Sequence, residues 1–378
     1  MFDENRLDNF ANRSSSKWRR FPADVMPMHV AEMDFEVAKE IRLTLSEMVK
    51  VSDLGYLGPI PEVANSFERY AKSQWDWNID KSKLKLATDV GVAAVEILRG
   101  VTTPGEKILI NSPVYSSFYH WIHEVGAKEL DVPLVRVGDD WKLDLPGIEK
   151  AFEEGVKVFM LCSPQNPVGR LHTKAELQAV SDLANKFGVL VIADEIHAPL
   201  SFAEFTPYLT VSGAEKNGVV ITSSSKAWNT AGLKAAFLLT QSDEVNHRLN
   251  VPEAMHWRSS LLGAFAMATA FESCQYWIDE TNQRLIENFE FLKAELAREL
   301  PKATLANLQA TYLAWIDLGE YGFANPQLQI LKHGKVALVA GEEHAPESEY
   351  SEFVRFNFAT SKTRIAEAVR RMKLGLES

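Results

Sequence analysis

Residues 156–194 read VKVFMLCSPQNPVGRLHTKAELQAVSDLANKFGVLVIAD, and this stretch is the strongest indication of the fold class. Its two ends, residues 156–162 and 189–194, are short apolar runs rich in β-branched residues, as in strands buried on both faces of a sheet. Between them, Thr173 and Glu176 form a capping-box pattern, apolar residues follow at helical spacing, and Gly188 is placed to end the helix. The stretch therefore predicts a β-α-β unit of an α/β domain.

The pattern continues on both sides of this unit. Three more apolar runs are predicted as strands of the same mostly parallel sheet: residues 107–111 (KILIN), 219–223 (VVITS) and 235–240 (AAFLLT). The C-terminal third instead predicts helices at 281–300 and 362–374 and strands at 311–318 and 352–358. We expect an α/β fold with a large domain at residues 46–282, whose sheet is sandwiched by helices. A smaller α+β domain is expected from residues 1–45 plus 283–378.

The composition disfavours several classes of protein. The 378 residues are 46% hydrophobic and 24% charged, as in folded globular proteins. Lys and Arg number 40 against 51 Asp and Glu, and this net charge of −11 disfavours nucleic-acid binding. No apolar segment reaches the ~18 residues of a membrane helix, and the start, MFDENRLDNF, does not resemble a secretory signal. We therefore expect a cytoplasmic protein with no membrane or nucleic-acid partner.

The chain has two cysteines, Cys162 and Cys274, and neither occurs in the spacing of a metal site. We expect both to be buried free thiols. No metal site is predicted.

Four side chains lie at or just after the ends of four predicted strands: Tyr115, Asn166, Asp194 and Lys226. Ligands of open α/β sheets bind at the carboxyl ends of the strands, so these side chains are expected to meet at one site. Together they suit pyridoxal 5′-phosphate (PLP). The lysine can form a Schiff base with its aldehyde, and the carboxylate can keep the pyridinium nitrogen protonated. The amide can donate to the ring's phenolic oxygen, and the tyrosine can stack on the ring.

Four motifs occur in order along the chain: NPVG with Asn166, DEIH with Asp194, SSSK with Lys226 and VRFNF with Arg355. Together they resemble the PLP fold-type I, aspartate-aminotransferase-like family. Within it, four segments are similar to the branch of cystathionine β-lyases and cysteine-S-conjugate β-lyases: AEMDF (residues 31–35), LGYLGP around Tyr56, DEIH with His197, and KAWNTAGLK (residues 226–234). The role of Asp34 in AEMDF is not assigned by the resemblance.

The resemblance, together with the local sequence, implies further site residues. Arg355 would bind the substrate α-carboxylate, and His197 would contact the ring oxygen or shape the pocket. Tyr56 would reach the phosphate of a neighbouring subunit, which implies a homodimer with shared active sites. The phosphate would be held by a helix N-terminus and three polar side chains: Val90, Gly91, Ser223, Ser225 and Lys234. Lys234 stands where aminotransferases carry an arginine. For each of these residues, an ordinary structural role remains the alternative.

The function implied by the resemblance is β-elimination of cystathionine or another cysteine S-conjugate to pyruvate, ammonia and a thiol, with a role in methionine biosynthesis. An aminotransferase of the same fold uses the same lysine and stays open as the alternative. A second alternative, from another class, is a non-catalytic regulatory protein that binds the cofactor. The preferred leaving group is not predictable from the sequence.

Overall fold

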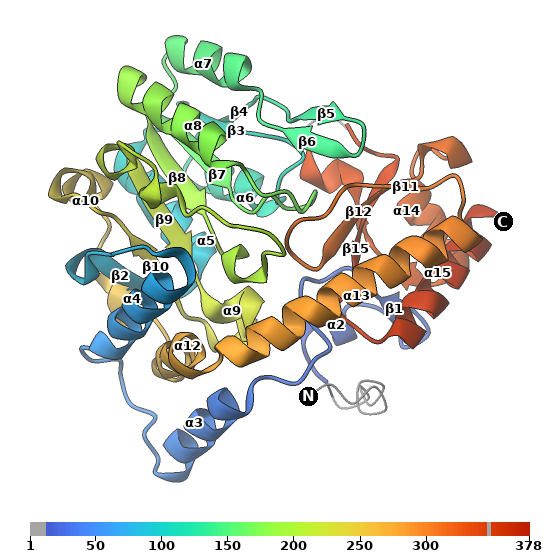
Figure 1. Cartoon of the computed structure of the whole chain (residues 1–378), viewed down its shortest axis with the longest axis horizontal. Coiled ribbons are helices and arrows are strands. Elements are labelled where there is room, and N and C mark those ends of the chain that lie inside the picture. The colour runs from blue at the N-terminus through green and yellow to red at the C-terminus, as the bar shows by residue number, and fades with distance from the viewer. Residues whose placement is uncertain (1–12, 346–348) are drawn as a thin grey trace.

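The computed structural model describes residues 13–345 and 349–378, and its centre is a seven-stranded sheet (Figure 1). The order of strands is β2-β10-β9-β8-β7-β3-β4. Of these seven strands, β10 alone runs in the opposite direction to the other six, so the mostly parallel sheet is confirmed. The strands are β2 (Leu84–Ala87), β3 (Lys107–Ile110), β4 (Lys128–Asp131), β7 (Val158–Cys162), β8 (Leu190–Asp194), β9 (Gly218–Thr222) and β10 (Ala236–Leu239).

The predicted β-α-β unit is present as β7, α8 (Lys174–Phe187) and β8. Thr173 caps α8 by accepting from the Glu176 amide, and the Glu176 carboxylate accepts in return from the Thr173 amide. Gly188 ends the helix with a φ of 69°, a conformation that glycine adopts at little cost. In the parallel pairing of β7 with β8, Cys162 lies opposite Asp194, so both strands end at the same edge of the sheet.

Apolar side chains on the two faces of the sheet form two separate cores. Along β7, Phe159 and Leu161 belong to one core and Val158 and Met160 to the other, as the alternation of side chains along a strand requires. The first core includes α4, α8 and α12, and the second includes α5 and α6 (Figure 1). The bounds of the helices named here for the first time are α4 (Pro61–Trp75), α5 (Val90–Val101), α6 (Ser117–Glu124) and α12 (Leu261–Ser273). Helices therefore cover both faces, as predicted.

A second, antiparallel sheet of four strands lies beside the large one, in the order β11-β12-β15-β14. Its strands are β11 (Thr304–Leu305), β12 (Leu313–Asp317), β14 (Val339–Ala340) and β15 (Phe353–Asn357). Two long helices, α13 (Gln275–Glu299) and α15 (Lys362–Leu376), pack against each other beside it (Figure 1). The predicted strands and the closing helix are confirmed. The predicted start of α13 at residue 281 was too late, because buried Trp277 and Ile278 already belong to its first turns.

The N-terminal part joins both regions. The short helix α2 (Ser16–Arg19) precedes β1 (Met26–Pro27), which pairs in parallel with β13 (Val336–Ala337). The next helix, α3 (Lys39–Lys50), packs against α12. Residues 1–12 of the expected small domain, including the start examined for a secretory signal, lie outside the described residues, as do residues 346–348.

The remaining short elements include β5 (Val135–Val137) and β6 (Asp140–Lys142), which pair as a hairpin, and α7 (Leu145–Glu153). Within the described ranges, none of the helices has both the length and the apolar character needed to cross a membrane. Cys162 and Cys274 are buried free thiols, as predicted.

Candidate active site

A cavity of about 270 Å³ lies at the carboxyl ends of β7, β8 and β9. Its lining contains most of the predicted site residues: Val90, Gly91, Tyr115, Asn166, Asp194, His197, Ser223, Ser225 and Lys226. Three predicted residues, Tyr56, Lys234 and Arg355, are not in the lining. The strand ends therefore bring together residues that are far apart in the sequence, as expected for this class of sheet.

Two of the ionisable groups that line this cavity are the buried Asp194 and the half-buried Lys226. Asp194 ends β8, and its Oδ1 accepts from the Ile196 amide at 3.1 Å. Burial raises the pKa of Asp194 to about 7. Lys226 lies in the short helix α9 (Ser224–Ala227), directly after β9. Burial, with a smaller contribution from the Arg355 guanidinium, lowers the pKa of Lys226 to about 8. A larger fraction of this amine is therefore neutral near pH 7, as a nucleophile or a base requires.

The Lys226 amine donates a hydrogen bond to the Ala31 carbonyl oxygen, at 3.2 Å. The same oxygen accepts from the Tyr312 hydroxyl at 2.8 Å. Ala31 also lines the cavity. Ala31 belongs to the AEMDF motif, but the sequence did not predict this contact, because every residue type has a backbone carbonyl.

The N-terminus of α5 faces the cavity with Val90 and Gly91. Asp89 caps this helix by accepting from the Val92 amide at 2.8 Å. A Cβ atom on Gly91 would lie 2.8 Å from the Trp121 indole nitrogen, so only glycine lets Trp121 approach this closely. Trp121 lines the cavity as well, and its position was missed because a helical tryptophan in α6 reads as an ordinary core residue.

The predicted phosphate-binding side chains have partners within the chain. The Ser223 hydroxyl donates to the Ala235 carbonyl at 2.7 Å and accepts from the Ser225 amide at 3.0 Å. Lys234 lies beside the cavity and pairs with Asp89, with 2.7 Å between Nζ and Oδ2. Because Asp89 lines the cavity, this pair places one positive and one negative charge at the end of the site formed by α5.

Arg355 reaches the site from β15 through Asn166. Its Nη1 donates to the Asn166 side-chain oxygen at 3.2 Å, and its Nη2 donates to the His29 carbonyl at 3.2 Å. The side chain is buried, and its Nε has no hydrogen-bond partner among the described residues. Asn357, two residues further along β15, donates to the carbonyls of Val30 and Glu32.

His197 is buried beside Asp194, in edge-to-face contact with the Tyr312 ring. Burial, together with Lys226 and Arg355, lowers the pKa of His197 to about 3, so the imidazole is neutral. Its Nδ1 also has no hydrogen-bond partner within the described part of the chain. Buried polar atoms are nearly always hydrogen-bonded, so His197 Nδ1 and Arg355 Nε are two polar atoms that a bound ligand could satisfy.

Tyr56 is fully exposed and lies outside the cavity of its own chain. The structure of one chain therefore does not bring it to the site. Residues 13–345 and 349–378 contain no cluster of His, Cys, Asp and Glu side chains arranged to hold a metal ion.

Known proteins match this chain over nearly its full length. The model of the family "Aminotransferase class I and II" matches residues 23–372. A Mycobacterium leprae protein, provisionally named a cystathionine beta-lyase, is 36% identical over 392 residues and covers 97% of this chain and 96% of its own length. Cystathionine beta-lyase PatB of Bacillus subtilis is 30% identical over 365 residues, with 93% of each chain covered.

A solved structure also matches the chain over its whole length. The PLP-bound structure of a Clostridium difficile protein, provisionally described as an aminotransferase, superposes with a TM-score of 0.94. It is 26% identical in sequence, and 100% of both chains is covered. The fold of this protein is therefore that of the PLP-dependent aminotransferases, and the chain belongs to the aminotransferase class I and II family.

Proposed function

We propose that this protein is a PLP-dependent carbon–sulfur β-lyase, which converts cystathionine or another cysteine S-conjugate to pyruvate, ammonia and a thiol. The observation that carries the proposal is the presence of Lys226 and Asp194, both with shifted pKa values, in one cavity at the carboxyl ends of the strands. The names of the sequence relatives from M. leprae and B. subtilis support the lyase activity.

The residues around the cavity fit PLP. His197 Nδ1, in the cavity lining, has no hydrogen-bond partner among the described residues. The N-terminus of α5 also reaches the cavity, and a helix N-terminus can donate backbone amides to a phosphate. The proposed holding residues are Lys226 for the aldehyde, Asp194 for the ring nitrogen, Asn166 and His197 for the ring oxygen, Tyr115 for the ring face, and Val90, Gly91, Ser223, Ser225 and Lys234 for the phosphate. When bound, PLP supplies an electron sink that stabilises negative charge on the substrate Cα.

The protein's own residues supply binding and proton transfer. We assign Arg355 to the substrate α-carboxylate, because a guanidinium holds a carboxylate with two hydrogen bonds. We assign Lys226 to removal of the Cα proton, since its lowered pKa of about 8 leaves a usable fraction of neutral amine. Asp194 and His197 are both buried, so bulk water is excluded from this side of the cavity. Loss of the Cβ thiolate then completes the elimination, and water hydrolyses the released 2-aminoacrylate to pyruvate and ammonia.

The second candidate is an aminotransferase, since the C. difficile protein is described as one. Arg355, Asp194 and Lys226 serve that reaction equally well. Lys234 favours the lyase, because by the resemblance aminotransferases carry an arginine at that position. A non-catalytic regulatory protein would bind PLP without releasing product.

The proposal also covers the oligomeric state, the cellular location and the domain division of the protein. We propose a cytoplasmic homodimer, with Tyr56 of each chain completing the site of the other, and a role in methionine biosynthesis. We keep the domain division at 46–282 and 1–45 plus 283–378, with α13 running from one domain into the other.

The test is the visible spectrum of the purified holoenzyme with and without L-cystathionine, together with an assay of pyruvate. We expect a change in the PLP absorption and continuous pyruvate release. Lys226→Ala should lower turnover at least about a thousandfold, whereas Lys186→Ala, a change in an exposed lysine paired with Glu149, should not. A spectral change without pyruvate would exclude the lyase, and PLP binding with no response to cystathionine would favour a regulatory role.

A further inference from the structure

A short segment of the chain, residues 30–35, passes over the cavity and contacts Lys226. We call this segment the strap. Its Ala31 carbonyl accepts from the Lys226 amine at 3.2 Å and from the Tyr312 hydroxyl at 2.8 Å. The backbone of the strap therefore fixes one of the directions in which the amine can point. Residues that hold the strap in place therefore also influence the orientation of the Lys226 amine.

The strap is fastened on two sides by asparagine side chains. On the side of α9, Asn229 accepts from the Met33 amide and donates to the Met33 carbonyl, both at 2.9 Å. On the side of β15, Asn357 donates to the Val30 carbonyl at 2.6 Å and to the Glu32 carbonyl at 2.7 Å. The strap thus joins the loop that follows Lys226 to the strand that carries Arg355.

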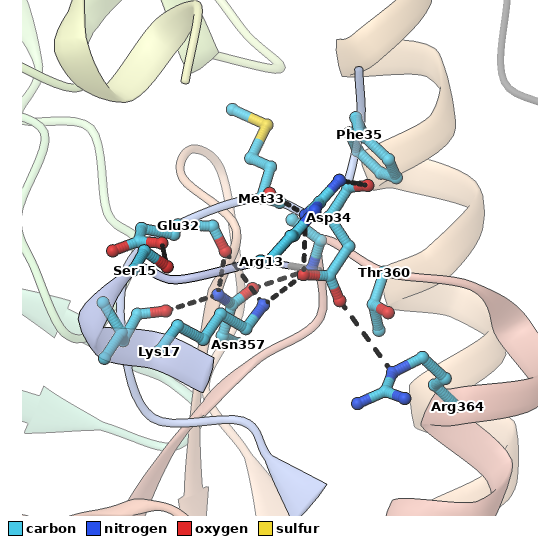
Figure 2. A network of polar contacts seen from close by, with 12 residues as sticks. Arg13, Ser15, Lys17, Glu32, Met33, Asp34, Phe35, Asn357, Thr360 and Arg364 are labelled. Carbon is cyan, nitrogen blue, oxygen red and sulfur yellow. Dashed lines mark hydrogen bonds and ion pairs between the residues drawn. The ribbon is translucent and has the colours of Figure 1, made fainter. Parts of the chain in front are cut away.

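The third fastening is a buried ionic cluster around Asp34. Figure 2 shows the Asp34 carboxylate with Lys17 on one side and Arg364 on the other. Asp34 Oδ1 lies 2.8 Å from Lys17 Nζ and 3.6 Å from Arg13 Nη1, and Oδ2 lies 3.9 Å from Arg364 Nε. The side chains of Asp34 and Lys17 are 0% and 1% exposed.

The cluster also grips the strap backbone. Lys17 donates to the Glu32 carbonyl at 3.0 Å, and Arg13 donates to the Asp34 carbonyl at 3.0 Å (Figure 2). The Asp34 amide in turn donates to the Ala359 carbonyl at 2.9 Å. A buried charge pair with several hydrogen bonds holds one geometry, because any movement leaves a charge without its partner.

We propose that Asp34 is a positioning residue for Lys226: its carboxylate, held by Lys17, Arg13 and Arg364, fixes the strap so that the Ala31 carbonyl aligns the Lys226 amine for its bond to PLP. The inference rests on the proposed function only in taking Lys226 as the residue that bonds to PLP. The inference gives a role to Asp34, to which the resemblance assigned none.

The strap also carries a charge that acts on Lys226. The charged and titratable groups that face the amine are Asp194 on β8, Arg355 on β15, Lys234 after α9, His197 after β8 and Glu32 on the strap. Glu32 and Asp194 raise the pKa of Lys226, and Arg355 and Lys234 lower it. Displacing the strap removes the Ala31 acceptor and the nearby Glu32 charge, and it also uncovers the amine, whose burial is the largest cause of its lowered pKa. The pKa of the amine should therefore change when the strap moves.

The test is the rate at which the apoenzyme bonds to added PLP at Lys226, measured by visible absorption across the pH range around 8. Borohydride reduction and peptide mapping then identify the lysine. Asp34→Asn alone leaves Lys17 buried without its counter-charge, which endangers folding. The main variant is therefore Lys17→Met combined with Asp34→Asn, which removes both charges. We expect bond formation to slow roughly tenfold or more and the midpoint of the pH–rate profile to shift by about half a unit.

The control is Asp144→Ala, which removes the cap of α7, where Asp144 accepts from the Gly147 amide at 3.1 Å. It should lower the melting temperature without changing the rate or the midpoint. A double variant with the wild-type midpoint, whether slowed or not, overturns the inference and leaves Asp34 a purely structural residue. If the wild-type apoenzyme bonds PLP at another lysine or not at all, the proposed function fails as well, so the two failures are distinguishable.

Discussion

Asp194 is a carboxyl group that the chain buries at a cost, since burial raises its pKa to about 7. A purely structural role would not require a buried carboxyl group, because a neutral residue at the end of a strand has a smaller desolvation penalty. We predict that Asp194→Asn retains PLP but slows removal of the Cα proton on the order of a hundredfold or more. An amide cannot stabilise a protonated ring nitrogen as a carboxylate does.

The measurement for this variant is stopped-flow absorption with a Cα-deuterated substrate, which isolates the proton-transfer step. PLP content and melting temperature, measured on the same preparation, separate a chemical effect from loss of the cofactor. Proton removal at the wild-type rate would reduce Asp194 to a structural residue.

For single side chains, the sequence was most informative where a residue type directly follows a buried strand. Asn166, Asp194 and Lys226 were predicted in this way, and the structure brings them into one cavity. Ala31 was not predicted, because its contribution is a backbone oxygen. The pairing of Lys234 with Asp89 was also not predicted, since 145 residues separate the two in the sequence.

Helix α8 is the element whose start was predicted in most detail. The Thr173 hydroxyl accepts from the Glu176 amide at 3.2 Å, and Arg170 holds the Glu176 carboxylate. We predict that Thr173→Ala lowers the free energy of unfolding by about 1 kcal/mol and leaves turnover unchanged. Denaturant unfolding is the measurement, and Thr173→Ser is the matched control because it keeps the hydroxyl. A turnover defect in Thr173→Ala would mean that α8 affects the site.

Elements with one strong local pattern were predicted well, and those that depend on distant contacts were not. The five central strands are apolar on both faces, so their sequences alone identify them. The first turns of α13 were missed, because Trp277 and Ile278 gain their burial from other parts of the chain. The strap has no regular structure, and side chains from three distant segments determine its shape.

The molecule as a whole exposes apolar side chains around α3 and the segment after it. Leu43, Val49, Val51 and Leu54 are each more than half exposed, and Tyr56 follows them. Figure 1 shows α3 at the edge of the molecule, away from the large sheet. An exposed apolar region of this kind is typical of an interface. We predict a homodimer in which Tyr56 of each chain binds the PLP phosphate held by the other.

Light scattering measures the mass in solution, and titration of the apoenzyme measures PLP affinity. Tyr56→Phe should weaken PLP binding roughly tenfold or more, because one hydrogen bond to a charged group is lost, while the dimer persists. A fully active monomer would contradict this arrangement. So would a dimer in which Tyr56→Phe binds PLP as tightly as the wild type.

The last prediction concerns the overall reaction that the assembled enzyme performs. Given L-cystathionine, it should release pyruvate, ammonia and a thiol in equal amounts over many turnovers without any added keto acid. Elimination returns the cofactor to its aldehyde form in every cycle, because the amino group leaves as ammonia. Transamination instead leaves the amino group on the cofactor, so an aminotransferase stops after one half-reaction until a keto acid restores it. Both reactions begin with removal of the Cα proton, which we assign to Lys226, and they diverge where the thiolate on Cβ leaves. Product counted per active site, with and without added 2-oxoglutarate, decides between them. One equivalent of product, with turnover resuming only after 2-oxoglutarate is added, would replace the lyase with the aminotransferase.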